Sequence, residues 1–433
     1  MAQNGVGWSQ RRGFKTRGDG GEVVRKHHPD RLIIVFTLIL MLIGLLMMYA
    51  IGPQRANLLN TLNGYEYSGT YFFVKQFVSF LLAGAAFAIM ARVPYEWAFK
   101  HGTKLLVVGF IACTLLAVLG AAGLSIAAAT NGASRWFYLG PLGSLQPAEI
   151  LKLGLLLYLA VFLGIRQKQG LINDRAKTLI PVVILAGFAL LFVIVIQKDL
   201  GTGIAITAIV STMLFVAGLS KKLILGLIGV LLVAGSLLIL TSPHRIERVA
   251  TYLKGDSSST SDDDSYHVQH AKIAIGSGGL FGVGIGSSVQ ASGYLPEAIN
   301  DSIFAVMGEM FGFVGLVAIM GLFIALLMRL LGVLDHLVDI RLKLAVAGVF
   351  GWIAAHVILN IAAMIGIFPL TGITLPLLSY GGTSMIFLTA ALGFVYQISR
   401  YTVHPSRIKE EDHEDSRSRR GVGRTRYASR RSS

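Results

Sequence analysis

Two acidic residues near the end of a long polar stretch are the first candidates for chemistry. Asp301 stands in Tyr294-Leu-Pro-Glu-Ala-Ile-Asn-Asp301, directly before a long apolar run, and Glu297 lies four residues earlier. An ionisable group at the edge of a membrane segment is a functional candidate by default. Asp301 also has a structural alternative, because aspartate is a favoured helix N-cap that accepts hydrogen bonds from the first helical amides. The alternative for Glu297 is a solvated loop acid.

Cationic side chains elsewhere are candidates to bind an anionic substrate. Glu149 and Lys152 are three residues apart at the start of an apolar run, so on a helix they share one face. Either they neutralise each other as an ion pair, or Lys152 stays positive in a cavity that receives the substrate. Arg135, beside Trp136, either reaches the membrane interface, where aromatic residues gather, or binds phosphate. Acids and cations together suit a lipid-linked anionic substrate, and they suit a transporter equally well.

Two further acids lie where burial demands a partner. Glu309, two turns into the apolar run after Asp301, would be costly if it faced lipid alone, so it is predicted to face the interior. There it forms a structural ion pair or takes part in catalysis. Lys198 and Asp199, between two apolar runs, can pair with each other.

The sequence gives little support for nucleotide or metal sites. The run Gly276–Gly286 matches neither a dinucleotide fingerprint nor a phosphate loop with its lysine, so we interpret it as a glycine turn with close helix approach. No His or Cys cluster has zinc spacing. Asp262–Asp264 could gather a divalent cation, although adjacent acids in a serine-rich stretch are more often just solvated. The single cysteine, Cys113, is interpreted as a small core residue.

These side chains must be positioned by membrane-spanning helices. Hydrophobic residues make up 54% of the 433-residue chain and charged residues 14%, whereas soluble domains carry roughly 25% charged residues. A helix needs about 20 apolar residues to cross ~30 Å of hydrocarbon. The sequence therefore predicts an all-α polytopic membrane protein with about ten spans, near residues 32–51, 72–91, 103–123, 148–165, 178–196, 200–218, 222–241, 302–328, 344–366 and 382–399.

The distribution of charge predicts the orientation. Of the 38 Lys and Arg residues, 29 lie in the two tails and in alternate short loops, which are therefore predicted to be cytoplasmic. A basic N-tail, 1–31, and a disordered basic C-tail, 401–433, flank one membrane domain, 32–400. The loop 242–301, between spans seven and eight, is expected on the outer side, with 255–265 disordered and the part after Tyr266 ordered. The net charge of +15 does not indicate nucleic-acid binding, because it is not gathered into a uniform basic groove.

The segment between the last two predicted spans, 367–382, is rich in Pro, Gly and Thr. Irregular backbone of this kind can sit at membrane depth only if it is buried in protein or lines a wet cavity. Its sequence, Gly366-Ile-Phe-Pro-Leu-Thr-Gly-Ile-Thr-Leu-Pro-Leu-Leu-Ser-Tyr-Gly-Gly-Thr383, resembles the signature of the SEDS family (shape, elongation, division and sporulation), which includes FtsW and RodA.

Further segments carry the same resemblance, which covers about 32–400. They are Tyr266 to Gly286, Tyr294 to Phe304, Arg135-Trp136 with Gln146-Pro-Ala-Glu149 and Lys152, and Gln197-Lys-Asp-Leu-Gly201. The chain departs from the family pattern at Lys198, Asn300, Ser302 and Met310, and it keeps the family's acidic residue as Asp301. His28-Pro29-Asp30 and the basic tails resemble the division protein FtsW more than RodA.

The resemblance implies a peptidoglycan glycosyltransferase of the bacterial cytoplasmic membrane. Such a protein polymerises lipid II on the outer face during septal wall synthesis, together with a class B penicillin-binding transpeptidase and other division proteins. Asp301 is then the general base, and attack inverts the MurNAc anomeric carbon. The departing undecaprenyl pyrophosphate needs cationic neutralisation. Lys152 and Arg135 rank first for this, followed by Arg245, Arg248 or a divalent cation such as Mg²⁺ or Mn²⁺.

Other residues of the motifs are expected to bind substrate or to shape the cavity. Glu149 and Glu297 are expected to bind the substrate. The residues expected to shape the cavity are Glu309, Asp199, Gln197, Pro369, Ser379, Tyr380, Gly381 and Gly382. Two alternatives remain: a lipid II flippase, and a non-catalytic scaffold of the division complex. The candidate groups lie mostly on the predicted outer side, which favours surface chemistry over a path through the membrane.

Overall fold

The computed structural model describes residues 28–129, 133–140, 143–223 and 263–402, with short pieces at 16–17, 23–24, 225–226 and 229. Its α-helices are α1 (Arg31–Asn63), α2 (Tyr71–Met90), α3 (Tyr95–Ala121), α4 (Pro147–Lys168), α5 (Ile180–Leu190), α6 (Leu200–Val216), α9 (Asp263–Ser277), α10 (Ile303–Asp335), α11 (Ile340–Met364) and α12 (Gly382–Ile398). The short 3₁₀ and π elements are η1 (Ser125–Ala127), η3 (Arg175–Leu179), η4 (Leu191–Ile196), η6 (Gln290–Ser292) and η7 (Ser399–Tyr401). The strands pair as two antiparallel hairpins, β1 (Thr16–Arg17) with β2 (Val23–Val24) and β3 (Phe137–Tyr138) with β4 (Ser144–Leu145).

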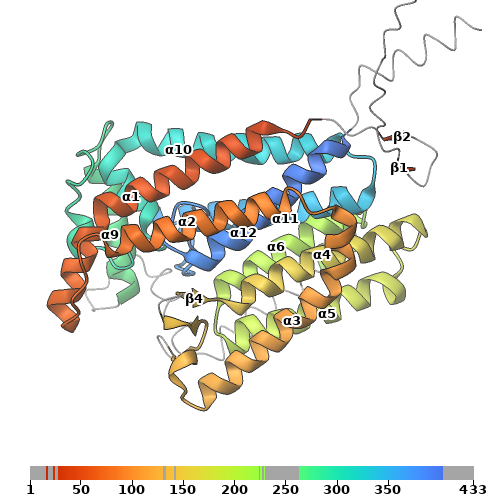
Figure 1. The fold of residues 1–433 in the computed structure, drawn as a ribbon, viewed down its shortest axis with the longest axis horizontal. Helices are drawn as coiled ribbons and strands as arrows, with labels where there is room; N and C mark the ends of the chain where they lie inside the picture. The colour runs from red at the N-terminus through yellow and green to blue at the C-terminus, as the bar shows by residue number, and fades with distance from the viewer. Residues whose placement is uncertain are drawn as a thin grey trace, which may run out of the picture.

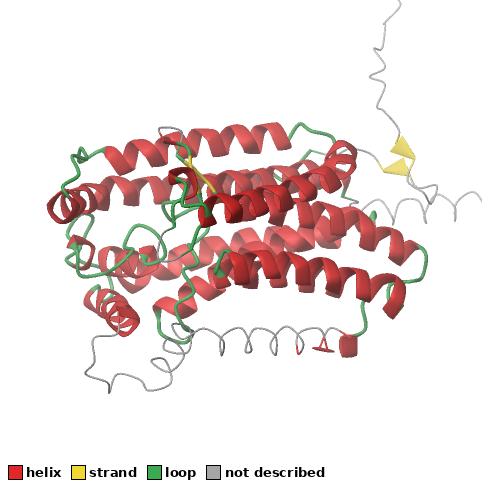
Figure 2. Ribbon diagram, turned by 90° about the horizontal axis from the view of Figure 1, so that it is seen from below, coloured by secondary structure: helices red, strands yellow, loops and turns green. Residues whose placement is uncertain are grey.

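Eight helical segments of the described chain are long and apolar enough to cross a membrane. They coincide with eight of the ten predicted spans, and Figure 2 shows how completely helices dominate the fold. The fifth span is composite, with α5 flanked by the π-helical turns η3 and η4. The sixth predicted span corresponds to α6, a shorter apolar helix of 17 residues. The seventh, 222–241, lies almost entirely outside the described residues.

The helices of the bundle differ in how much of their apolar surface is covered. Helices α4 and α12 each bury 72% of their most apolar window and α11 buries 67%, whereas α2 buries 17% and α3 buries 22%. The first three therefore form the centre of the domain, and the other two leave most of their side chains partly or fully exposed, as lipid-facing helices do. In Figure 1, α11 and α12 lie between α1 and α10 on one side and α3 to α6 on the other.

The start of α1 and the end of α12 lie at the same end of the bundle. The Asp30 carboxylate caps α1 by accepting from the Leu32 amide, and the Asp30 amide donates to Ser399 Oγ at 2.9 Å, just beyond α12. The β3–β4 hairpin and α9 lie toward the opposite end (Figure 1). This arrangement agrees with the charge pattern, which places both tails on one side; that this side is cytoplasmic stays a prediction.

The stretch predicted as one long outer loop contains a helix. The prediction of order after Tyr266 is confirmed, but α9 begins at Asp263, so residues 263–265 are helical rather than disordered; 255–262 lie outside the described residues. Helix formation continues through His267 and Lys272 because no Pro or Gly interrupts the segment before Gly276.

The glycine-rich run after α9 packs against a break in α10. Gly312 interrupts the helix with φ 66° and ψ −168°. The amide of Val283 donates to the Glu309 carbonyl at 2.9 Å, and the amide of Phe313 donates to the Gly279 carbonyl at 2.8 Å, so the run supplies partners that the broken helix lacks. A Cβ atom on Gly282 would overlap the Met310 carbonyl. The prediction of a glycine turn with close helix approach is confirmed.

Candidate functional site

Asp301 lies in the turn before α10, and it is not the cap of that helix. The N-cap is Ser302, whose side chain makes no capping bond to the helix. Ser302 Oγ is fully buried, donates to the Pro296 carbonyl at 2.8 Å and also contacts the imidazole of His267 on α9. The structural alternative for Asp301 therefore does not hold, because its neighbour occupies the capping position.

The main chain at Asp301 is held against the segment 366–382. Nδ2 of Asn360 on α11 donates to the Asp301 carbonyl and to the Ile373 carbonyl, both at 2.7 Å. The Tyr380 amide donates to the Ile299 carbonyl at 2.8 Å. A Cβ placed on Gly372, which has φ +68°, would lie 4.0 Å from Asp301 Oδ2. The carboxylate therefore approaches a glycine of the signature segment, where the absence of a side chain leaves room.

The signature segment reaches inward between the helices, as irregular backbone at membrane depth requires. Ser379 Oγ accepts from the Leu375 amide at 2.8 Å, and the Ser379 carbonyl accepts from Nε2 of Gln76 on α2 at 3.3 Å. A Cβ on Gly382 would lie 3.0 Å from Ser79 Oγ. The start of α12 therefore packs against α2 at a point about two turns after α2 begins. The other predicted cavity residues belong to this same segment: Pro369 and Gly381 are partly buried, and the Tyr380 ring packs edge-on against Phe72 with centroids 5.5 Å apart.

Glu149 and Lys152 form an ion pair inside the bundle. Lys152 Nζ lies 2.8 Å from Glu149 Oε1, and the two side chains are 0% and 2% exposed. Nζ also lies 4.6 Å from the ring centre of Trp352 on α11, which is a cation–π contact. Of the two interpretations that the sequence leaves open, the structure shows the ion pair.

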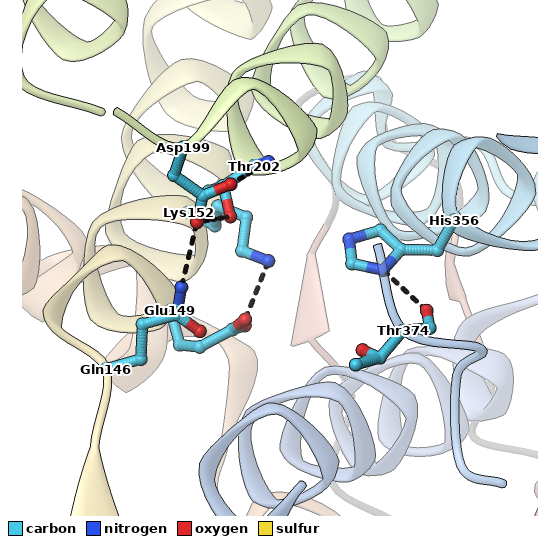
Figure 3. Close-up of polar contacts among 7 residues, drawn as sticks. All are labelled: Gln146, Glu149, Lys152, Asp199, Thr202, His356 and Thr374. Carbon is cyan, nitrogen blue, oxygen red and sulfur yellow. Dashed lines mark hydrogen bonds and ion pairs between the residues drawn. The ribbon is translucent and has the colours of Figure 1, made fainter. Parts of the chain in front are cut away.

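Asp199 caps α6 within a small polar cluster. Its carboxylate accepts from the Thr202 amide at 2.9 Å, from Thr202 Oγ1 at 2.8 Å and from Nε2 of Gln146 at 3.1 Å (Figure 3). These three bonds hold the Asp199 carboxylate at the start of α6, and a local pair with Lys198 stays a prediction. Gly201 packs directly on Ile373, which brings the start of α6 to the same segment that holds Asp301.

Arg135 fixes the turn that precedes α6. Its Nε donates to the Gln197 carbonyl at 3.2 Å and one terminal nitrogen donates to the Lys198 carbonyl at 2.8 Å. Lys198 has φ +51°, an unusual conformation for a non-glycine residue, and these two bonds stabilise it. The Gln197 side chain itself is buried.

Glu309 is buried, as predicted, but it forms no ion pair with any residue that the structure describes. Its carboxylate accepts from Ser288 Oγ, from the Val289 amide at 3.0 Å and from the Gln290 amide at 3.2 Å. Amides at the start of a helical turn favour a negative charge, so the acid caps η6 from a neighbouring helix. The role that the structure gives Glu309 is to anchor the chain leading to Asp301.

Replacing Glu309 with leucine is expected to lower the free energy of unfolding by about 2–4 kcal/mol, because buried amides lose their charged acceptor. Thermal unfolding of the protein purified in detergent measures this. Glu66→Leu, at an exposed position between α1 and α2, is the control and should shift the transition little. Equal stability of the Glu309 variant and the wild type would contradict the anchoring role.

The remaining predicted site residues lie at the surface or outside the described chain. Glu297 is exposed, has φ +49°, accepts from Asn300 and lies 4.0 Å from Arg55, a separation at which an exposed pair adds little stability. Arg245 and Arg248 lie outside the described residues, as does Asp262 of the acidic run 262–264, whose other two residues begin α9. Among the residues described, no three His, Cys, Asp or Glu side chains gather closely enough to hold a metal ion, and the divalent cation stays a prediction.

Sequence reasoning missed three polar residues that the structure places at the site. They are His267 on α9, which contacts Ser302, and His356 and Asn360 on α11. His356 and Asn360 are polar residues four apart within an apolar run, and such spacing places both on one helix face. Intramembrane polar residues are functional candidates, so this signal was available in the sequence.

Comparison with known proteins gives matches over nearly the whole chain. Residues 30–404 match the cell cycle protein family of FtsW, RodA and SpoVE. Stage V sporulation protein E of Bacillus subtilis is 35% identical over 382 residues, which are 87% of this chain and 99% of that protein. The probable peptidoglycan glycosyltransferase FtsW of Nitrosomonas europaea is 32% identical, covering 85% and 92% of the two chains.

Solved structures share the fold. A chain from a peptidoglycan synthase complex, described as coordinating polymerization and crosslinking, is 26% identical with a TM-score of 0.65, over 86% of this chain and 98% of that one. The rod shape determining protein RodA of Thermus thermophilus is 25% identical with a TM-score of 0.58, over 87% and 98%. On the family match, the two relatives and the polytopic helical fold together, this chain belongs to the FtsW, RodA and SpoVE family of cell cycle proteins.

Proposed function

We propose that this chain is a peptidoglycan glycosyltransferase that polymerises lipid II at the outer face of the bacterial cytoplasmic membrane, during septal wall synthesis. The observation that carries the proposal is the placement of Asp301. Its main chain is clamped by Asn360 to the signature segment, and its carboxylate faces Gly372. The relatives named as glycosyltransferases and the fold of the synthase complex support the activity.

In the proposed reaction, Asp301 acts as the general base. It accepts the proton of the GlcNAc 4-hydroxyl of lipid II while that oxygen forms a bond to the MurNAc anomeric carbon of the growing chain. The bond from this carbon to the pyrophosphate oxygen breaks, and undecaprenyl pyrophosphate leaves with the electron pair. An α-linked donor then gives a β-1,4 product, so the configuration at the carbon inverts.

The negative charge that develops on the leaving pyrophosphate has to be neutralised. Of the two cations ranked first from the sequence, Arg135 is the accessible one, because it is partly exposed and Lys152 is fully buried. A guanidinium carries five N–H donors, and two of its nitrogens serve the carbonyls of Gln197 and Lys198. We therefore assign pyrophosphate contact to Arg135, with Arg245 and Arg248 as further candidates.

The proposed partner is a class B penicillin-binding transpeptidase, with other division proteins. The synthase complex that shares this fold is described as coordinating polymerization with crosslinking, which supports such a pairing. A polymerase and a transpeptidase in one assembly would link each new glycan strand to the wall as it forms.

The test is polymerisation by purified protein. The full chain, co-purified with its transpeptidase and placed in sealed vesicles with labelled lipid II, is expected to produce long glycan strands. The same vesicles report flipping of the label between leaflets, so both activities are measured together. Flipping without polymer would contradict the proposed function and favour the transporter; neither activity, with division supported in cells, would favour the scaffold.

A further inference from the structure

One face of α11 connects the buried ion pair to Asp301. Trp352, His356 and Asn360 are spaced four residues apart and therefore lie one above another along the helix. Trp352 receives the Lys152 ammonium on its ring. Asn360, two turns further on, binds the Asp301 main chain. His356 stands between them.

The imidazole of His356 has the signature segment on one side and the buried ion pair on the other. Its Nδ1 lies 3.4 Å from the Thr374 carbonyl, and because a carbonyl only accepts, Nδ1 carries the proton. In Figure 3 the other side of the ring faces the pair of Glu149 and Lys152. The ring is 7% exposed, and within the described chain Nε2 has no hydrogen-bond partner, nor does Glu149 Oε2. Buried polar atoms require a partner, so we expect a water molecule between α4 and α11 to link these two atoms to the remaining donors of Lys152.

We propose that Glu149 and Lys152 are positioning residues. They fix the position of Asp301 through the face of α11 that carries Trp352, His356 and Asn360. The proposal rests on the proposed function, since it assigns a task within that reaction. Lys152 has no exposed surface and therefore does not touch the pyrophosphate. Its charge instead holds α11 against α4, so that His356 orders the segment at Thr374 and Asn360 fixes the main chain of Asp301.

The mechanism by which this pair affects the rate is geometric. A misplacement of ~1 Å in a reacting group can cost about 10²-fold in rate. Asn360 bridges the Asp301 and Ile373 carbonyls, so a shift of α11 along its axis moves both walls of the site together. Loss of the pair is therefore expected to reduce kcat, without weakening the binding of lipid II.

The main variant neutralises both charges, Glu149→Gln with Lys152→Met, because removing one charge alone would leave the other unpaired in the membrane. Lipid II polymerisation by the full chain with its transpeptidase is expected to show kcat lowered by about 10- to 100-fold with KM within about twofold. Inhibition by added inorganic pyrophosphate is expected to be unchanged. Lys104→Met, at an exposed position of α3, is the matched control with normal activity.

A second variant tests the route. His356→Leu is expected to lower kcat by about 10-fold, and combining it with the neutral pair is expected to add little, since residues that act through one contact are non-additive. Three results would overturn the inference: a raised KM or weaker pyrophosphate inhibition in the neutral pair, wild-type kcat in either variant, or multiplicative losses in the combination. Thermal unfolding in detergent checks that each variant folds. A wild-type protein that makes no polymer would instead overturn the proposed function, and this outcome is distinguishable because it does not depend on the variants.

Discussion

Replacing Asp301 with asparagine is expected to lower kcat for lipid II polymerisation by about 10²–10⁴-fold, the range typical of a lost general base. Asparagine has the shape of aspartate but cannot accept a proton at neutral pH. Asn360 holds this turn through the Asp301 carbonyl, which the substitution keeps. Thermal unfolding and co-purification with the transpeptidase should therefore match the wild type, and the loss should be confined to chemistry.

Glu297→Gln is the matched control for this experiment. It removes a carboxylate from the same turn, four residues earlier, where the side chain is 48% exposed and its nearest cation is 4.0 Å away. Activity is expected to fall by no more than a few-fold, in line with the small energies of exposed pairs. Normal polymer from Asp301→Asn, or an equal loss in both variants, would remove Asp301 from the role of base.

The second large effect concerns the glycine run that fills the break in α10. Gly282→Ala is expected to lower the free energy of unfolding by about 2–5 kcal/mol, the sum of left-handed backbone strain and overpacking. Gly282 has φ +82°, and its Cβ would overlap the carbonyl of Met310, which is backbone and cannot rotate away. The measurement is thermal unfolding in detergent, with polymerisation as a second readout because the break lies eleven residues after Asp301.

Gly284 offers a control that separates strain from packing. It has φ +99°, so alanine there meets the same kind of conformational strain, yet no atom lies within 4 Å of the added Cβ. Gly284→Ala is expected to cost only about 1–2 kcal/mol. Equal losses for the two variants would show that contact with α10 contributes nothing to stability.

The sequence predicts those features that depend on local composition. Runs of apolar residues identify eight of the spans because crossing hydrocarbon demands the same length everywhere in the chain. The signature segment and Asp301 are found together because their motifs are long. Glu149 and Lys152 could be placed on one face, but a spacing of three residues does not say whether the pair meets water.

The features that escaped prediction depend on contacts between distant segments. Glu309 is an acid in an apolar run, and nothing nearby reveals that its partners are the amides of Val289 and Gln290. His356 and Asn360 carry a readable spacing, but only the fold shows that they face Thr374 and Asp301.

Helix α12, the last α-helix of the described residues, packs against α1 and α2. Thr389 Oγ1 donates to the Ala83 carbonyl at 3.0 Å, and Ser399 accepts from Asp30. During synthesis, α1 and α2 therefore enter the bilayer long before α12, which packs against them, has left the ribosome. Until then the surfaces of α1 and α2 that α12 covers stay exposed. A chain truncated before Gly382 keeps the upstream spans but lacks this packing, so we expect it to be inactive.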